Sequence, residues 1–487
     1  MKQKYLSLAF VALFLFTNSL GAQQGAKNII IMISDGTSWG TWDAASLYEH
    51  GVRVMKHPVF STFPVAFAMT TFPLNPNSSP TNNDRAMVSY DPVQAWNSTP
   101  KAEDSRGAGK FPFVGYNYLT KNFTDSAAAA TAMATGTKTY NNSINMDNYG
   151  KPIPFISQMA KAAGKVVGVI TSVSFSHATP GAFGAQNLSR NNYHDIAEQM
   201  LNEGTLDLIM GGGGHPWHNE SGVELEKPHF DMIAEYQWEG LKANTVVPWG
   251  SPEAWLLIQD KAEFEALASG SLKTTRPLVA VARAGWTLQN DRRKVPLGED
   301  LSLPSGIARN ALVPTLNTMT KGALQYLVDR DKKGKGFFLM IEGGAVDWSA
   351  HSNKLATAIE ESLDFTRSLE TVIRWVETNS SWNETLLIIT TDHGNGMPYG
   401  PEGKTTQAFQ PLSGLKGQVP AVTWEVGTHS NELVYLWAKG KGSEGFNQYT
   451  SPEKKDVKAK EVMQLPDDRY IDNTNVFDLV KSQLTNP

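Results

Sequence analysis

Acidic and histidine side chains recur at one kind of position in this chain, directly after runs of apolar residues typical of buried strands. Asp35 follows residues 28–34, Glu342 follows 336–341, and Asp392 and His393 follow 386–391. Carboxylates are scarce at buried strand ends unless they are paired or bound to metal. In open α/β sheets the carboxyl ends of the strands form the ligand crevice, so these side chains should converge. The repetition therefore predicts a cation site.

One candidate ligand set mixes nitrogen and oxygen donors. Asp347 and His351 are four residues apart, which places them on one face of a helix. Together with His429 they would form a set suited to zinc, with one coordination position left open. Taken singly, each residue has a simpler interpretation. Asp347 and His351 could be a surface pair on a helix, and His429 could be a loop histidine satisfied by local hydrogen bonds.

Two further sets share Asp35. Asp35, Asp392 and His393 would make a second site of similar chemistry. Asp35, Thr179 and Glu342 offer mostly hard oxygen donors, which suit magnesium. The Asp392-His393 pair alone could belong to a turn. Chance is a poor explanation for so many metal-binding side chains at four or more predicted strand ends.

Ser126 is the candidate nucleophile. It precedes a run of strong helix formers that Gly136 is placed to close. The start of a helix has unpaired backbone N–H groups and a positive dipole end, both of which favour anions. The alternative is that Asp125 or Ser126 merely caps the helix. No histidine base is evident beside Ser126 in the sequence.

These residues must be positioned by alternating strands and helices, which predict an α/β fold with a mostly parallel central sheet and helices on both faces. The predicted strands are 28–34, 165–171, 206–210, 336–341, 386–391 and 432–438. The predicted helices are 42–50, 158–163, 192–202, 315–330 and 355–378.

Two long segments interrupt the alternation. Residues 58–116 are rich in Pro, Asn and Ser and are expected to form a surface excursion. Residues 215–312 are expected to form an inserted cap-like module within a catalytic domain that spans 27–485. The glycines at 211–214 are followed by no phosphate-loop signature, so they indicate a tight exit from the sheet.

Composition excludes several classes of protein. The chain has 487 residues, a net charge of -5 and no cysteine, and its pI is near 6.1. There is no basic footprint for nucleic acid, and disulfides and thiolate zinc sites are ruled out. Residues 1–22 have the charged start, apolar run and small-residue end of an export signal, so we expect a periplasmic or secreted protein. No other stretch predicts a membrane span.

Taken together, the motifs resemble those of the alkaline phosphatases, in the family's order and over nearly the whole mature chain. The matching blocks are Ser34-Asp35-Gly36, Thr124-Asp125-Ser126-Ala127, His177-Ala178-Thr179-Pro180, Glu342-Gly343-Gly344 through Asp347 and His351, Thr391-Asp392-His393-Gly394, and Gly427-Thr428-His429-Ser430.

The resemblance implies a phosphate monoesterase that works through a phosphoserine at Ser126. It assigns the first two ligand sets to two zinc ions and the third set to one magnesium ion. Arg190 follows His177 by the spacing at which the family places its phosphate-clamping arginine. The expected substrates are small phosphate monoesters, and a homodimer is compatible with the resemblance.

His177 marks a division within the family, because some members have aspartate at this position and the animal-type branch has histidine. The resemblance therefore implies the histidine variant of the third metal site, with His177 as an outer-shell residue that reaches the metal through water. A phosphodiesterase or sulfatase with a related metal site is one alternative function. A non-catalytic metal- or phosphate-binding protein of the cell surface is another.

Overall fold

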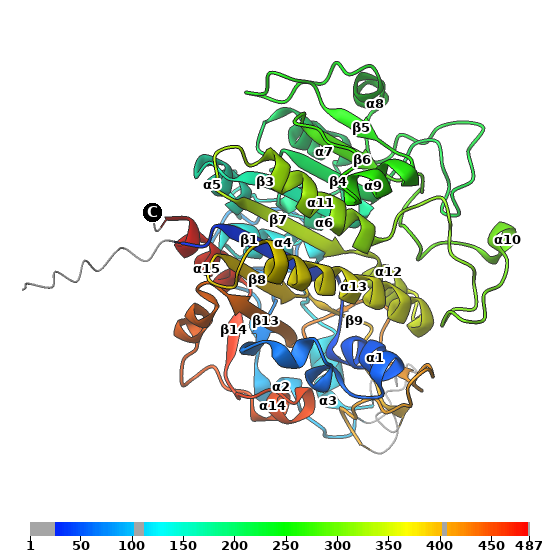
Figure 1. Ribbon diagram of the computed structural model, residues 1–487. Coiled ribbons are helices and arrows are strands. Elements are labelled where there is room, and N and C mark those ends of the chain that lie inside the picture. The colour runs from blue at the N-terminus through cyan, green and yellow to red at the C-terminus, as the bar shows by residue number, and fades with distance from the viewer. Residues whose placement is uncertain (1–24, 102–111, 402–406, 486–487) are drawn as a thin grey trace, which may run out of the picture.

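A computed structural model describes residues 25–101, 112–401 and 407–485. The predicted export signal, residues 1–22, lies outside the described residues. Among the described helices, none combines the length and the apolar character needed to cross a bilayer. The chain folds around one large sheet flanked by helices on both faces (Figure 1).

The central sheet has ten strands in the order β14-β2-β13-β8-β1-β7-β3-β4-β6-β5. Their bounds are β1 Asn28–Ser34, β2 Val65–Thr70, β3 Val166–Ser174, β4 Leu208–Gly213, β5 Leu256–Ile258, β6 Leu278–Val281, β7 Phe337–Gly343, β8 Thr385–Thr390, β13 Val434–Gly440 and β14 Tyr470–Asp472. Only β13 runs against its neighbours, pairing antiparallel with β2 and β8. The sheet is therefore mostly parallel, as predicted.

Two small pairs of strands lie outside the sheet. They are β9 Gly394–Asn395 with β12 His429–Ser430, and β10 Pro398–Tyr399 with β11 Thr423–Trp424. The β9–β12 pair matters for the site because it brings the loop after β8 against His429.

The helices form two layers, one on each face of the sheet. Their bounds are α1 Trp39–His50, α2 Pro92–Ala95, α3 Val114–Leu119, α4 Ser126–Thr135, α5 Ile156–Ala162, α6 Ala178–Ala182, α7 Tyr193–Asn202, α8 Glu235–Lys242, α9 Lys261–Ala268, α10 Lys294–Leu297, α11 Leu316–Arg330, α12 Ala345–His351, α13 Leu355–Asn379, α14 Val457–Met463 and α15 Thr474–Thr485. α1, α9, α11 and α13 pack together on one face, and α4, α5, α6 and α15 on the other.

The apolar run of β1 explains this two-sided core. Successive side chains of a strand point to opposite faces. Ile30 and Met32 accordingly pack into the core cluster on the α11–α13 side. Ile29, Ile31 and Ile33 pack into the cluster on the α4–α15 side. All seven residues of β1 are buried, which is typical of a central parallel strand.

The prediction of a surface excursion over 58–116 is wrong for part of that segment. Residues 65–70 form β2, which is fully buried between β14 and β13. The apolar run Val-Ala-Phe-Ala-Met is short and stands among Pro and Asn residues. Its strand character becomes evident only from its antiparallel pairing with β13.

Residues 215–312, for which an inserted module was expected, are joined to the sheet in their middle part. β5 and β6 lie at the sheet edge next to β4, and all three strands are parallel. The stretches before β5 and after β6 lie outside the sheet. The expected cap-like module can therefore comprise only those flanking stretches.

Candidate active site and metal centre

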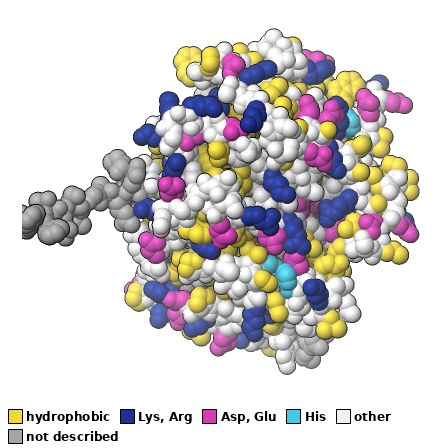
Figure 2. Space-filling model, in the orientation of Figure 1, with side chains coloured by type: hydrophobic (Ala, Val, Ile, Leu, Met, Phe, Trp, Pro, Cys, Tyr) yellow, Lys and Arg dark blue, Asp and Glu magenta, His cyan; other side chains and the backbone are white. Residues whose placement is uncertain are grey.

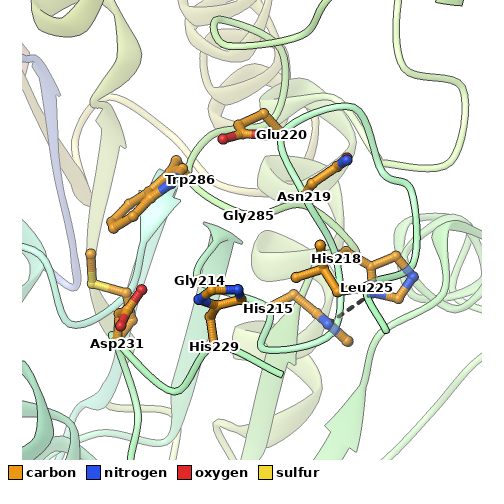
Figure 3. A pocket seen from close by; sticks show the side chains of 11 residues that line it. Gly214, His215, His218, Asn219, Glu220, Leu225, His229, Asp231, Gly285 and Trp286 are labelled. Atoms are coloured by element: carbon orange, nitrogen blue, oxygen red, sulfur yellow. Dashed lines mark hydrogen bonds between the residues drawn. The ribbon is translucent and has the colours of Figure 1, made fainter. Parts of the chain in front are cut away.

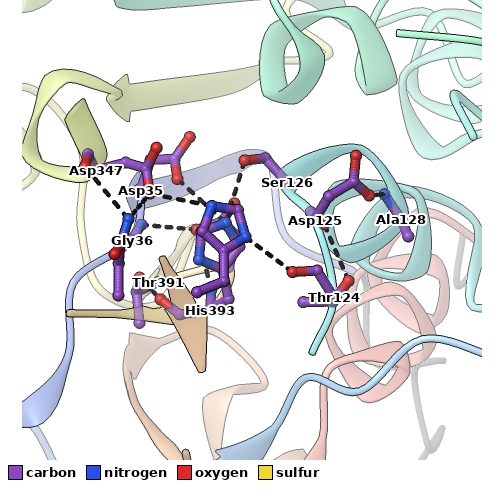
Figure 4. Close-up of polar contacts among 12 residues, drawn as sticks. Asp35, Gly36, Thr124, Asp125, Ser126, Ala128, Asp347, Thr391 and His393 are labelled. Carbon is purple, nitrogen blue, oxygen red and sulfur yellow. Dashed lines mark hydrogen bonds and ion pairs between the residues drawn. The ribbon is translucent and has the colours of Figure 1, made fainter. Parts of the chain in front are cut away.

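The three central strands deliver the predicted acidic residues to one place. β1 lies between β7 and β8, and Ile33 is paired with Glu342 on one side and with Thr390 on the other. The residues that follow β1 and β8, Asp35 and Asp392, therefore lie at the same end of the sheet as Glu342. Figure 4 shows Asp35 gathered with side chains from the α4 and α12 regions.

The structure brings Asp347, His351 and His429 together. His351 Nε2 lies 3.3 Å from Asp347 Oδ2, and His429 Nε2 lies 3.4 Å from Asp347 Oδ1. The two Nε2 atoms are 3.1 Å apart. The Asp347–His351 contact follows from their spacing on α12. His429 is held in place by the β9–β12 pairing. These donors are grouped closely enough to bind one metal ion.

Backbone carbonyls fix the tautomers of three histidines in the site. His351 Nδ1 lies 3.1 Å from the carbonyl of Gly427, His429 Nδ1 lies 2.8 Å from that of Thr124, and His393 Nδ1 lies 3.2 Å from that of Gly394. Since a carbonyl only accepts, each Nδ1 carries the proton in the neutral ring. Each Nε2 is thereby left with a free lone pair, as metal-binding histidines require.

His393 belongs to a second group of donors with the strand-end carboxylates. Its Nε2 lies 3.2 Å from Asp392 Oδ2 and 3.5 Å from Asp35 Oδ1. Asp35 and His393 also group closely with Asp347, which the sequence had placed only in the first set. Asp347 therefore lies between the two groups, and its Oδ1 accepts a hydrogen bond of 2.6 Å from Asn395 Nδ2.

The third predicted set is buried and lacks donors for its oxygens. Asp35 Oδ1, Glu342 Oε1 and Asp392 Oδ2 are inaccessible to water and receive no hydrogen bond in the described part of the chain. Thr179 Oγ1 lies against Glu342 and makes no hydrogen bond of good geometry. Unpaired buried oxygens of this kind are costly. Divalent cations would satisfy them, so the residues fit the implied metals.

The electrostatics lead to the same conclusion. Burial, and then the neighbouring Asp392, Asp347 and Glu342, raise the pKa of Asp35 well above its usual value. Burial raises the pKa of Glu342 to about 7 and that of Asp392 to about 6. Crowded carboxylates disfavour their own charged forms, and a bound cation reverses that preference.

Ser126 is the first residue of α4, and Asp125 is the cap. Asp125 Oδ1 accepts a 3.0 Å hydrogen bond from the backbone N–H of Ala128, and Gly136 ends the helix with φ 71°. Ser126 Oγ lies 3.1 Å from His393 Nε2 (Figure 4). A histidine that the sequence did not place beside the serine therefore accepts a hydrogen bond from its hydroxyl. The same nitrogen is the one aimed at Asp35 and Asp392.

Arg190 is brought beside Ser126 through Asp125. One guanidinium nitrogen lies 3.1 Å from Asp125 Oδ2, the oxygen not used for capping. The other lies 3.3 Å from His177 Nε2. Burial, and then Arg190, lower the pKa of His177 to about 3, so its ring is neutral. His177 Nδ1 is buried and has no hydrogen-bond partner among the residues that the structure describes.

These side chains open into one cavity of about 510 Å³. Sequence reasoning did not select Phe123, Asp291 and Trp348, which line it together with Ser126 and Arg190. Asp291 comes from the segment after β6, and Trp348 directly follows Asp347. Adjacency to Asp347 is the signal that could have identified Trp348, whereas no local signal marks Asp291.

A second cavity, of about 390 Å³, contains three further histidines (Figure 3). His215 and His218 have their Nδ1 atoms 3.0 Å apart. The Nδ1 of His215 also accepts from the backbone N–H of Trp217, and its Nε2 lies 2.9 Å from the side-chain oxygen Oε1 of Gln259. Both His215 nitrogens are therefore engaged, and the pair is a hydrogen bond rather than a metal site.

A third group lies at the end of α1. His57 Nε2 and His50 Nε2 are 3.3 and 3.5 Å from Glu49 Oε2. Arg367 pairs with the other oxygen of Glu49. His57 Nδ1 accepts a 3.1 Å hydrogen bond from the backbone N–H of Val59, so its Nε2 carries the proton.

Comparison with known proteins gives consistent matches. The family model described as alkaline phosphatase matches residues 93–464. Alkaline phosphatase 4 of Bacillus subtilis is 30% identical over 301 residues, which cover 61% of this chain and 54% of the relative. The chain thus spans about half the length of that relative. Alkaline phosphatase of Escherichia coli is 27% identical over 425 residues, 82% of this chain and 77% of the relative.

The fold also matches solved structures. Alkaline phosphatase from the Antarctic bacterium TAB5 superposes with a TM-score of 0.58 at 20% identity, covering 96% of this chain and 99% of that one. A variant of the same enzyme, with a histidine replaced by aspartate, has been solved with Mg bound in the M3 site.

Proposed function

Since the chain belongs to the alkaline phosphatase family, we propose that it hydrolyses phosphate monoesters to an alcohol and inorganic phosphate through a phosphoserine at Ser126. One observation carries the proposal. Ser126 Oγ lies at hydrogen-bond distance from His393, at the meeting point of two groups of metal-binding side chains.

Ser126 would act as the nucleophile. Its position at the start of α4 exposes it to unpaired backbone N–H groups, which stabilise negative charge on the serine oxygen and on the phosphoryl group it accepts. His393 Nε2 lies within hydrogen-bond distance of Oγ, which places Oγ beside the acidic cluster. In metal-loaded protein the lone pair of Nε2 would bind the metal, so Oγ would lie next to the ion instead of donating to the ring. An in-line attack on phosphorus then needs mainly positioning and charge stabilisation.

Arg190 would bind the non-bridging oxygens of the phosphate. A guanidinium presents a planar pair of donors that match two phosphate oxygens. Asp125 keeps Arg190 in place while its other oxygen caps α4. One carboxylate therefore sets both the start of the nucleophile helix and the position of the arginine.

The acidic and histidine residues would hold two zinc ions and one magnesium ion. Asp347, His351 and His429 form the first zinc set, and Asp35, Asp392 and His393 the second. Asp35, Thr179 and Glu342 form the magnesium set. When bound, the ions supply Lewis-acid stabilisation of the attacking and leaving oxygens. His177 would act from the outer shell of the third site, and its unpaired Nδ1 offers a place for an ordered water.

We also propose export of the chain, to the periplasm or the medium. The support is the signal-like pattern of residues 1–22. Amino-terminal sequencing of the mature protein from the extracytoplasmic fraction tests this, and a protein that retains residues 1–22 in the cytoplasm would contradict it.

Ser126→Ala tests the reaction. Zinc- and magnesium-loaded protein should release phosphate from an aryl phosphate monoester, and far more slowly from a diester or an aryl sulfate. Ser126→Ala should lower the turnover by roughly 10³-fold or more, because the covalent intermediate is lost. Acid-quenched native protein should yield a phosphorylated Ser126 peptide. The control is Ser352→Ala, which alters another hydroxyl of the same cavity. Near-native turnover by Ser126→Ala would refute the assignment.

A further inference from the structure

Lysine side chains surround one cavity at the end of the sheet opposite to Ser126. The cavity has a volume of about 460 Å³ and is bordered by the residues that precede β1, β3, β7 and β8. Its lysines are Lys27, Lys165, Lys333, Lys335 and Lys441. Among the described residues that line it, Glu384 is the only acidic one. Figure 2 shows Lys and Arg side chains along the left edge of the molecule, where the parallel strands of Figure 1 begin.

Lys165 is the buried lysine among those that line this cavity. Its side chain is buried, and its Nζ donates to three backbone carbonyls, those of Ala26 at 2.9 Å, Lys27 at 2.7 Å and Lys335 at 3.0 Å. Burial lowers the pKa of Lys165 to about 8. The charge of Asp331 opposes this shift, and the charges of Lys27 and Lys335 add to it. The fold thus holds a desolvated ammonium group among other ammonium groups.

The remaining four lysines of the cavity have no salt-bridge partner in the described part of the chain. The nearby Asp331 is engaged with the backbone, accepting from the N–H groups of Lys335 and Gly336 at 3.0 and 2.8 Å. This shapes the loop before β7 so that Lys333 and Lys335 remain exposed. The excess positive charge is notable because the whole chain has a net charge of -5.

The basic surface continues beyond this cavity. A neighbouring cavity of about 340 Å³ shares Lys165 and Lys333 and adds Lys332. Of its two described acidic residues, Asp207 is paired with Lys161 and Arg330, and Asp331 accepts from backbone N–H groups. Like charges held this close repel one another, and a low-dielectric concave wall strengthens the local field. An anion with several charges would relieve that repulsion.

We propose that the lysine cavity at the amino-terminal end of the sheet binds clustered phosphate groups, at a site separate from the catalytic cavity. Lysine ammonium groups bind phosphate as point charges and need no fixed donor geometry. Two sources present this chemistry: a free oligophosphate and a surface of anionic phospholipid headgroups. The proposal does not depend on the phosphatase reaction, because Ser126 lies at the other end of the strands.

The test uses the full-length, metal-loaded protein and two probes that the proposed activity does not consume. The first probe is myo-inositol hexasulfate, measured by titration calorimetry. The second is co-sedimentation with phosphatidylcholine vesicles containing phosphatidylglycerol, compared with pure phosphatidylcholine. Lys333→Glu/Lys335→Glu should weaken binding by roughly tenfold or more, since two positive charges beside the bound anion are replaced by negative ones. The matched control is Lys227→Glu/Lys273→Glu, which makes the same charge change at exposed lysines elsewhere.

Binding of hexasulfate alone would support a free polyanion as the ligand, and binding of both probes would support headgroup binding. Either outcome supports the site on three conditions. The Lys333→Glu/Lys335→Glu variant must lose binding, the control variant must keep it, and the two variants must retain native turnover of aryl phosphate. Equal binding by the native protein and the Lys333→Glu/Lys335→Glu variant would overturn the proposal. Absence of binding to either probe would overturn it too.

Discussion

Two clusters in this molecule have nearly the same donor spacing but opposite hydrogen-bonding environments. In the candidate metal centre, His351 and His429 lie 3.3 and 3.4 Å from oxygens of Asp347. At the end of α1, His57 and His50 lie 3.3 and 3.5 Å from Glu49. Ligands about 2.0–2.1 Å from a tetrahedral zinc are separated by roughly 3.4 Å, so both clusters have suitable spacing.

The two clusters differ in the backbone group that hydrogen-bonds to Nδ1 of their histidine rings. Carbonyls face Nδ1 of His351 and His429, which leaves their Nε2 atoms free to bind metal. A backbone N–H faces Nδ1 of His57, which places the proton on the Nε2 atom that points at Glu49. Glu49 is also paired with Arg367. The distances between donor atoms therefore identify candidate metal sites. The hydrogen-bond partner of each Nδ1 decides whether Nε2 is free to bind metal.

The largest expected effect separates the clusters by metal content and activity. His351→Ala should remove one zinc ligand, lower the bound zinc and reduce kcat/KM by roughly 10²–10⁴-fold, because a catalytic metal supplies several kcal/mol. His57→Ala should leave zinc content and kcat/KM within about twofold, because it lies outside the catalytic site. Metal analysis and steady-state kinetics measure both. A comparable loss of zinc in the two variants would contradict the conclusion that only the Asp347 cluster binds metal.

The next largest effect compares two arginines that pair with carboxylates, Arg190 with Asp125 and Arg367 with Glu49. Arg190→Ala should lower kcat/KM by roughly 30- to 1,000-fold, which corresponds to about 2–4 kcal/mol of lost transition-state stabilisation, because a charged contact to phosphate is lost. Arg367→Ala removes a half-exposed ion pair and should change the free energy of unfolding by less than about 1 kcal/mol. Kinetics and urea denaturation measure these effects. An unchanged KM and kcat in Arg190→Ala would refute the clamp.

In metal-free protein, the contributions of two carboxylates, Glu342 and Glu49, to the pH dependence of stability should differ in sign. Burial raises the pKa of Glu342, so its contribution is present below the unfolded value near 4.5 and lost as the pH rises toward about 7. The loss should reach up to about 3 kcal/mol. The pKa of Glu49 is lowered by His57 and Arg367 against the opposing effect of burial. Its contribution is therefore present above pH 4.5 and lost on acidification.

Urea denaturation of metal-free protein between about pH 2.5 and 8 measures both trends. Glu342→Gln should flatten the loss of stability toward neutral pH, and Glu49→Gln should affect only the acid side. If metal-free Glu342→Gln keeps the full native pH dependence, ionisation of Glu342 does not destabilise the folded protein and the explanation is wrong.

The smallest expected effect comes from removing the backbone N–H that donates to His57 Nδ1. Val59→Pro removes the backbone N–H that faces His57 Nδ1, at a position whose φ of -82° is close to that of proline. Zinc binding at the Glu49 cluster should rise by about tenfold at most, since outer-shell partners typically alter affinity by 10–100-fold. Titration with a competing zinc indicator measures this, with Val59→Ala, which keeps the backbone N–H, as the control. Unchanged zinc binding would show that the N–H is not what excludes the metal.

Much of the site could be predicted from sequence because each residue sits beside a strong local pattern. Asp35 follows an apolar run whose ends, Asn28 and Ser34, are the bounds of β1. Asp347 and His351 are linked by helical spacing. The relation of Arg190 to Ser126 was found only through the family resemblance, because it depends on a carboxylate, Asp125, 65 residues away in the chain.

What the sequence could not reveal depends on pairing between distant segments. β2 is recognisable as a sheet strand only once β13 lies beside it. The approach of His393 to Ser126 joins residues 267 positions apart. The lysine cavity likewise exists only because the sheet order places the starts of four strands side by side. No local periodicity encodes such contacts.

The parallel arrangement of β1 has a consequence for how the two ends of the molecule influence each other. Its seven residues separate the lysine cavity from Asp35 by roughly 23 Å of extended chain. Ionic screening in physiological salt acts over about 8 Å. Charge on the exposed lysines is therefore largely screened at that distance, and neutralising them should leave the pH–rate profile of the candidate active site nearly unchanged.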